Sequence, residues 1–312
     1  MFANTLKDQG IEVRFVDPSN PENFRNASDK KTRAYFGETL PNPKLDIFLI
    51  EEISSIGRKI GIPLILDNTA APYICKPFSH GASIIVHSTT KFIGGQGSAV
   101  GGVIIDGGNF QWESFKEQQP ALNSPDPSYH GAVWSEAAKP LGPIAYILKA
   151  RTTLLRDLGY AMSPFNAFQF IQGLETLSLR IEKQSRNAEK VTSFLDSHDK
   201  VSKVIYPTLK NDSKARDKYF TRNLFGNLVG FHLKDGCEAC KKFIDNLQLF
   251  YHVANIGDVR SLAIHPSSTT HSQLSLEDQE KAGVFKDYIR LSVGIEHEDD
   301  IILDIKSALE KI

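Results

Sequence analysis

Three short apolar runs, each followed by polar residues, constrain the fold of this chain more than any other feature of its sequence. They span residues 62–66, 82–86 and 102–105. Continuous apolar runs of this length are typical of strands buried on both faces, as in a parallel sheet. Just before the first of these runs, apolar residues recur every three or four positions from Leu49 to Ile60, which predicts a covering helix. The first half of the chain is therefore predicted to be α/β, with a parallel sheet.

Weaker patterns predict the remaining elements. Alternation or apolar content predicts further strands at residues 11–17, 34–39, 201–206, 228–233 and 288–293. A long helix is expected after Pro164, and a last helix begins at the acidic residues from Glu298 onward, which suit its dipole. The long helix is expected to bridge two units, so we expect a first domain at residues 1–167 and a second at residues 168–312.

Composition excludes several classes of protein. The chain has 36 Lys and Arg against 37 Asp and Glu, a formal net charge of −1, which gives no electrostatic reason to expect a nucleic-acid partner. The apolar runs are far shorter than the roughly 18 residues of a membrane span, and the first residues lack the pattern of a signal peptide. Three cysteines favour a reducing, cytoplasmic location. No metal site is expected, because Cys237 and Cys240 have no second pair and are better explained as one helix face.

Polar side chains gather where the predicted strands end. Asp67 ends one apolar run, and the segment from His87 to Lys91 follows the next and leads into the glycines of residues 94–97. Ligands of open α/β sheets bind at the carboxyl ends of the strands. A carboxylate, hydroxyls and a lysine there suit pyridoxal 5′-phosphate, which needs a lysine for its aldehyde and an acid for its pyridine nitrogen.

Each of these motifs alone has an ordinary explanation. An Asp-Asn-Thr sequence after a strand often caps a helix or forms a turn, and glycines often form turns. A lysine beside them is commonly a solvated surface group. Their occurrence together at successive strand ends favours the cofactor site.

The motifs also resemble a known family. Residues 67–72 and 81–95, the latter containing His-Ser-Thr-Thr-Lys-Phe-Ile-Gly-Gly, resemble the signature of the Cys/Met-metabolism pyridoxal-phosphate enzymes. Within that family, stretches at 129–131, 155–159, 173–177, 254–258, 261–266 and 269–274 resemble the O-acetylhomoserine sulfhydrylase group. The resemblance extends over essentially the whole chain. It implies a type I, aspartate-aminotransferase-like fold with an α/β C-terminal domain.

By that resemblance, individual residues acquire expected roles. Lys91 would form the internal aldimine, Asp67 would pair with the pyridine nitrogen, and Ser88 and Thr90 would bind the phosphate. Asn42 would lie at the ring hydroxyl, and Arg290, helped by Ser261, would bind the substrate α-carboxylate. Guanidinium is well suited to binding a carboxylate through two hydrogen bonds.

The implied reaction is replacement at the γ-carbon of O-acetylhomoserine by sulfide or a thiol, giving homocysteine or methionine plus acetate. Elimination from methionine or cystathionine is an alternative that keeps the cofactor. A non-catalytic remnant and a nucleotide-binding α/β protein are alternatives from other classes, although the glycines form no Gly-x-Gly-x-x-Gly directly after a strand.

Three parts of the family pattern have no counterpart at the front of this sequence. They are an opening arm that reaches a partner's phosphate, a phosphate loop at a helix N-terminus, and a tyrosine that stacks on the cofactor ring. We therefore expect a large domain truncated at its N-terminus, weak cofactor binding by the chain alone, little turnover and a tendency to associate. A separate N-terminal segment and a homo-oligomer are the expected polypeptide partners.

Overall fold

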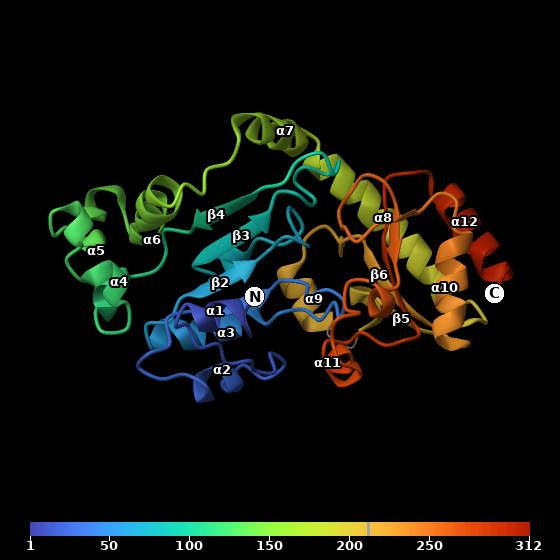
Figure 1. Cartoon of the computed structure of the whole chain (residues 1–312), viewed down its shortest axis with the longest axis horizontal. Coiled ribbons are helices and arrows are strands. Elements are labelled where there is room, and N and C mark those ends of the chain that lie inside the picture. The colour runs from blue at the N-terminus through green and yellow to red at the C-terminus, as the bar shows by residue number, and fades with distance from the viewer. Residues whose placement is uncertain (211–212) are drawn as a thin grey trace.

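The computed structural model describes residues 1–210 and 213–312, which form two sheets with helices around them (Figure 1). The strands are β1 Tyr35–Glu38, β2 Leu64–Asp67, β3 Ile84–Ser88, β4 Gly102–Asp106, β5 Val201–Ile205, β6 Leu228–Leu233, β7 Tyr251–His252, β8 Leu262–Ile264 and β9 Tyr288–Ser292. The α-helices are α1 Thr5–Asp8, α2 Glu22–Asn26, α3 Ile50–Lys59, α4 Pro120–Asn123, α5 Trp134–Ala137, α6 Ala145–Ala150, α7 Pro164–Glu175, α8 Leu177–Asp196, α9 Ser213–Tyr219, α10 Gly236–Asn246, α11 Leu276–Lys281 and α12 Glu298–Glu310.

The first sheet has the strand order β1-β2-β3-β4 and confirms the α/β prediction for this half. Strands β1, β2 and β3 are parallel, but β4 runs antiparallel to β3, so the expectation of an all-parallel sheet is wrong at this strand. The connection at residues 89–101 contains glycine turns and no crossover helix, so the chain reverses direction. Helix α3 covers part of the sheet, as its apolar periodicity predicts.

Two other expectations also need correction. Residues 11–17 form no strand: Ile11 and Phe15 are largely exposed, and alternation without a neighbouring strand to supply hydrogen bonds does not make a sheet. The long helix after Pro164 is two helices, α7 and α8, which meet at Thr176.

The second sheet has the order β5-β6-β9-β8-β7 and is antiparallel except for the β7–β8 pair. The sequence predicts β5, β6 and β9 but misses β7 and β8, which are only two and three residues long. Helices α8, α10 and α12 pack on this sheet, and their apolar faces meet those of β6 and β9 in one core. Cys240 lies in that core, which confirms the helix-face interpretation of its spacing with Cys237.

The two halves share packing elements. Helix α9, although it follows β5 in the chain, contributes Ala215 and Tyr219 to the core of the first sheet. Helix α8 runs from the top of the first sheet into the second half (Figure 1). Among the described helices, none combines the length and apolar character needed to cross a bilayer.

Candidate active site

The carboxyl ends of β1, β2 and β3 bring together several residues that the sequence singles out. Asp67 lies opposite Val86 in the β2–β3 register, and Ser88 is two residues further along β3. Because alternate residues of a strand share a face, Asp67 and Ser88 lie on the same face of the sheet. Asn42 follows the end of β1 at this edge and is exposed.

Thr69 connects Asp67 to Ser88. The backbone N–H of Thr69 donates to Asp67 Oδ1 at 2.8 Å, and the backbone N–H of Ser88 donates to Thr69 Oγ1 at 2.8 Å. The two bonds fix the position of the Asp67 carboxylate relative to the end of β3. The Thr90 hydroxyl already has main-chain hydrogen-bond partners: it accepts from Gly101 N–H at 3.0 Å and donates to the Gly101 carbonyl at 3.2 Å.

Lys91 follows β3 and reaches toward the second half of the molecule. Its Nζ donates to Asn255 Oδ1 at 2.5 Å, across 164 residues of sequence. Partial burial lowers the pKa of Lys91, and the positive charge of Arg290 lowers it further. A lowered pKa increases the neutral amine fraction at a given pH, and the neutral amine is the form that attacks an aldehyde.

Arg290, in the central strand β9, is only 7% exposed. Its Nη2 donates to the main-chain carbonyl of Asn255 at 2.8 Å, whereas its buried Nε has no hydrogen-bond partner among the described residues. Burial lowers the pKa of Arg290 to about 10. A buried guanidinium with an unpaired N–H is costly unless an anion completes it, so this side chain is suited to bind a carboxylate.

Ser261 has a different environment from the one the sequence suggests. It is fully buried just before β8, and its hydroxyl donates to Glu296 Oε2 at 2.9 Å and accepts from Gly294 N–H at 2.8 Å. These bonds join two loops of the second half. The substrate-binding role of Ser261 stays a prediction.

Asn255 and Thr69 have no role predicted from the sequence, although both lie within the family-like segments 254–258 and 67–72. Asn255 contacts Lys91 through its side chain and Arg290 through its main chain, so it connects the two halves of the site. Its local sequence, a short loop after β7, carries no signal that it meets a lysine so far away. Thr69 could have been inferred, because it directly follows Asp67 at a strand end.

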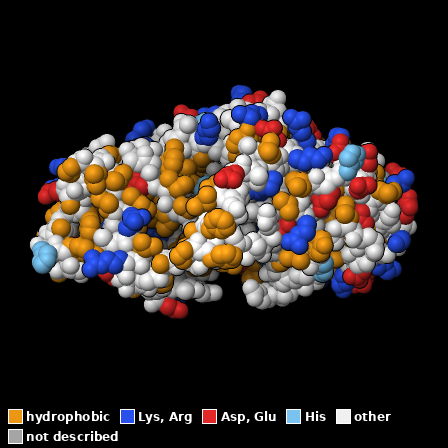
Figure 2. All heavy atoms as spheres, turned by 90° about the horizontal axis from the view of Figure 1, so that it is seen from above, with side chains coloured by type: hydrophobic (Ala, Val, Ile, Leu, Met, Phe, Trp, Pro, Cys, Tyr) orange, Lys and Arg blue, Asp and Glu red, His pale blue; other side chains and the backbone are white. Residues whose placement is uncertain are grey.

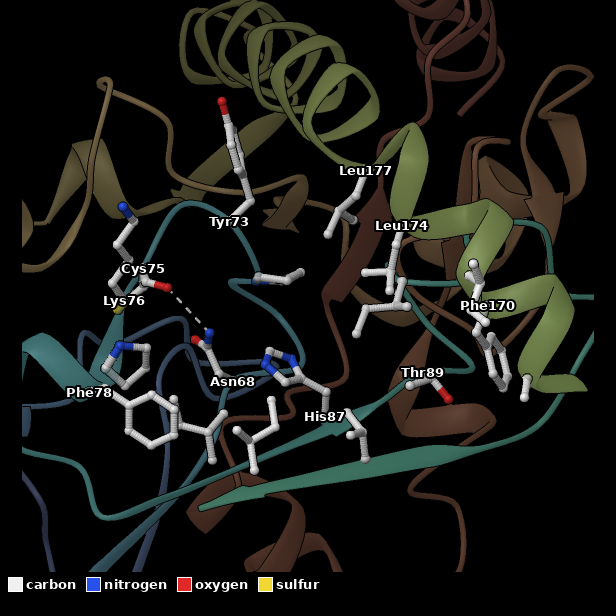
Figure 3. A pocket seen from close by; sticks show the side chains of 18 of the residues that line it. Asn68, Tyr73, Cys75, Lys76, Phe78, His87, Thr89, Phe170, Leu174 and Leu177 are labelled. Carbon is white, nitrogen blue, oxygen red and sulfur yellow. Dashed lines mark hydrogen bonds between the residues drawn. The ribbon is translucent and has the colours of Figure 1, made fainter. Parts of the chain in front are cut away.

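A separate cavity of about 660 Å³ lies on the opposite face of the first sheet (Figure 3). It is lined mainly by apolar side chains from β3, β4, the 72–78 segment and α7, including Phe78, Phe170 and Leu174. His87 and Thr89 also line it, and these alternate with Ser88 along the strand and so face away from it. This cavity includes neither Lys91 nor Arg290.

Comparison with known proteins places this geometry in a family. The family model for Cys/Met metabolism PLP-dependent enzymes matches residues 1–310. The chain belongs to this family. The O-acetyl-L-homoserine sulfhydrylase of Leptospira meyeri is 52% identical over 316 residues, covering 99% of this chain and 71% of that protein. The homocysteine/cysteine synthase of Saccharomyces cerevisiae is 43% identical, covering 100% and 72%.

Solved structures of the family agree with the fold. A Campylobacter jejuni structure, described as an O-acetylhomoserine (thiol)-lyase, superposes with a TM-score of 0.92 at 43% identity, covering 99% of this chain and 73% of that one. It contains N′-pyridoxyl-lysine-5′-monophosphate. The metB protein of Corynebacterium glutamicum gives a TM-score of 0.78 at 30% identity, covering 98% and 70%. This chain therefore has the type I fold of the family, whose cofactor is pyridoxal phosphate.

The residues at the strand ends fit that cofactor. Lys91 offers an amine with a lowered pKa, and Asp67 offers a carboxylate held at a fixed position by Thr69. Ser88 adds a half-buried hydroxyl on the same face of the sheet. Pyridoxal phosphate presents an aldehyde, a ring nitrogen and a phosphate, which are complementary to these three groups.

Proposed function

We propose that this protein is an O-acetylhomoserine sulfhydrylase-type transferase that uses pyridoxal phosphate to replace the γ-substituent of O-acetylhomoserine with sulfide or a thiol. The observation that carries the proposal is the pairing of Lys91 with Arg290 through Asn255. A reactive amine beside an incompletely paired buried guanidinium is what an α-amino-acid substrate requires. The names of the relatives support the choice of substrate.

When bound, pyridoxal phosphate supplies an electron sink for negative charge that develops at the substrate carbons. The protein's own residues do the rest. Asp67 would keep the ring nitrogen protonated, Ser88 and Thr90 would hold the phosphate, and Asn42 would lie at the ring hydroxyl. Arg290 would orient the substrate carboxylate. Lys91 would take protons from Cα and then Cβ before acetate leaves, and return them to Cβ and Cα after sulfur adds. At Cγ the bond to acetate breaks and a bond to sulfur forms, so acetate leaves with the electron pair.

Product analysis tests this proposal directly. Purified protein with pyridoxal phosphate, O-acetylhomoserine and sulfide should release acetate and homocysteine in equal amounts. The alternative, elimination, would give a 2-oxo acid and ammonia from methionine or cystathionine without added sulfide. Failure to form either product set, even with the completing segment proposed below and with cofactor bound at Lys91, would contradict both enzyme proposals.

We further propose that residues 1–167 and 168–312 act as a cofactor-binding and a C-terminal domain, and that a polypeptide segment completes the first one. Two observations support a partner segment: the outer side of β4 is unpaired among the described strands, and the adjacent cavity is apolar. Figure 2 shows hydrophobic side chains gathered over the first half of the molecule when viewed from the α7 side. If the first domain needs such a segment, the chain alone should bind the cofactor weakly and turn over little substrate.

Adding back a segment tests that part of the proposal. An N-terminal segment taken from a family relative, co-expressed with this chain, should raise turnover and tighten cofactor binding. Unchanged, full activity of the chain alone would contradict the need for a segment. We also propose a homo-oligomer, to be measured by light scattering, and a cytoplasmic location, which the three free cysteines support.

A further inference from the structure

Three buried polar side chains form a row along one face of helix α8. They are Arg180, Gln184 and Asn187, and they are 7%, 0% and 1% exposed. Their spacing of four and then three residues places them on the same face of the helix. Burying such side chains is unfavourable unless each finds hydrogen-bond partners, so their contacts indicate what the row does. We call these three residues the donor row.

Arg180 binds the segment that immediately follows Lys91. Its Nη1 donates to the carbonyl of Phe92 at 2.7 Å, and its Nη2 donates to the carbonyl of Ile93 at 3.0 Å. A Cβ on Gly95 would clash with the Arg180 guanidinium, which would then have to shift. The loop that presents Lys91 is therefore packed directly against helix α8.

Gln184 and Asn187 bind two other segments of the site. The Gln184 side-chain amide donates to the carbonyl of Asp258 at 2.7 Å, in the loop that carries Asn255. The Asn187 amide donates to the carbonyls of Gly294 at 3.0 Å and Glu296 at 2.9 Å, just after strand β9. Each member of the row thus holds a segment that carries Lys91, Asn255 or Arg290, or that directly follows it in the chain.

The three segments are also hydrogen-bonded to one another. Val259 N–H donates to the carbonyl of Gly95 at 2.8 Å, and Ile295 N–H donates to the carbonyl of Val259 at 2.8 Å. The segments therefore lie side by side along α8, in the order of the donors that hold them. A shift at one of them would be transmitted to its neighbour.

We propose that the donor row of α8 positions Lys91, Asn255 and Arg290 relative to one another. The inference rests on the proposed function, because it assumes that Lys91 binds the cofactor and Arg290 the substrate. Arg180, Gln184 and Asn187 are positioning residues, since they act through main-chain carbonyls and do not touch the reacting atoms. Loss of alignment of about 1 Å in such a site reduces its efficiency by up to about a hundredfold.

The test compares two measurements on the 312-residue chain. The first is the pyridoxal phosphate concentration at which half of Lys91 forms a borohydride-reducible adduct, determined by peptide mapping. The second is the affinity of the cofactor-loaded protein for L-norvaline, an amino acid with no leaving group. Ser185→Ala is the matched control, because Ser185 lies on the same helix, is 3% exposed, and its hydroxyl has no partner among the described residues.

Arg180→Gln should raise the half-saturating pyridoxal phosphate concentration about tenfold or more, and Arg180→Lys, which keeps the charge and fewer donors, should give an intermediate value. Asn187→Leu should weaken norvaline binding about tenfold while leaving the Lys91 adduct within about twofold. If Arg180→Gln does not fold, Arg180→Lys alone tests the proposal, and its half-saturating pyridoxal phosphate concentration should lie above that of Ser185→Ala.

Two results would overturn the positioning role. One is that the donor-row variants match Ser185→Ala in both measurements. The other is that cofactor binding and norvaline binding both weaken in proportion to the loss of thermal stability, since a purely structural role produces that result. If wild-type protein carries the adduct on lysines other than Lys91, the proposed function itself fails, and this inference fails with it.

Discussion

The two sheets of this molecule are covered to very different extents. In the second sheet, every residue of β6 and β9 is buried, and three helices pack over one continuous core. In the first sheet, β4 is open: Val103, Ile104 and Ile105 are between 37% and 39% exposed. Helix α7 beside it also exposes apolar residues, among them Phe168 and Ile171.

This difference shows how the site is divided. Arg290 sits in the middle strand of the well-covered sheet, where its position is fixed by neighbours on both sides. Lys91 belongs to the sheet with an open edge, and its loop is held from the other half, by α8. The substrate side of the site should therefore be the more rigid one. The cofactor side should depend more on contacts from outside its own sheet.

The largest expected difference between the two regions is the loss of unfolding free energy when an aromatic side chain is truncated in each. Phe231→Ala in β6 should lower the free energy of unfolding by about 3–5 kcal/mol, because this side chain is fully buried and its loss leaves a cavity. Phe168→Ala in α7, where the ring is 54% exposed, should lower it by less than about 1 kcal/mol. Urea unfolding measures both. Equal losses would show that the two regions are equally well packed.

The next effect tests the substrate side. Arg290→Met should weaken amino-acid binding by about 2–5 kcal/mol, because a buried partner of the carboxylate is lost. Adduct formation between Lys91 and pyridoxal phosphate should persist in this variant. Arg222→Met is the control, since Arg222 lies on the surface with an exposed ion pair to Glu182. Equal loss of amino-acid and cofactor binding would point to a folding role for Arg290.

The pH dependence of adduct formation tests the electrostatic interaction between Lys91 and Arg290. Burial and the charge of Arg290 lower the pKa of Lys91, so the neutral amine becomes abundant at lower pH than for a free lysine. Removing the charge in Arg290→Met leaves only the effect of burial, so the pKa of Lys91 should rise. The onset of adduct formation should then move to higher pH when followed by absorbance. An unchanged or lower onset would contradict this connection.

The smallest effect concerns the open edge. Val103→Lys on β4 should change the free energy of unfolding by no more than about 0.5 kcal/mol, because the side chain is already partly in water. It should, however, reduce self-association, since a charged edge resists pairing. Analytical ultracentrifugation measures the association. A large loss of stability would mean that β4 is covered in solution.

Much of the first sheet could be predicted from the sequence, because its strands are compact apolar runs with a clear stop. The direction of β4 could not, since an apolar run has the same pattern in a parallel and an antiparallel strand. Residues 11–17 mislead for a related reason: alternation describes a face but says nothing about a hydrogen-bonding neighbour. Strands β7 and β8 are too short for any period to show.

The sequence indicates candidate site residues where a local motif marks them, and it misses residues that only tertiary contacts bring to the candidate site. Lys91 and Asp67 follow strands, so their position at the sheet edge can be inferred from chain order. Asn255 meets Lys91 through the packing of two distant loops against α8, and the buried amides of α8 look like ordinary polar residues in sequence. Ser261 shows the converse, since a motif match does not reveal that Glu296 already binds its hydroxyl.

The most direct test of the account is the covalent position of the cofactor. Incubation with pyridoxal phosphate, reduction with borohydride and peptide mapping should place a single pyridoxyl group on Lys91, and Lys91→Ala should carry none. Lys76, which lines the apolar cavity on the opposite face, provides an internal control in the same digest and should stay unmodified. A label on Lys76, or one spread over several lysines and retained in Lys91→Ala, would contradict the assignment of this site.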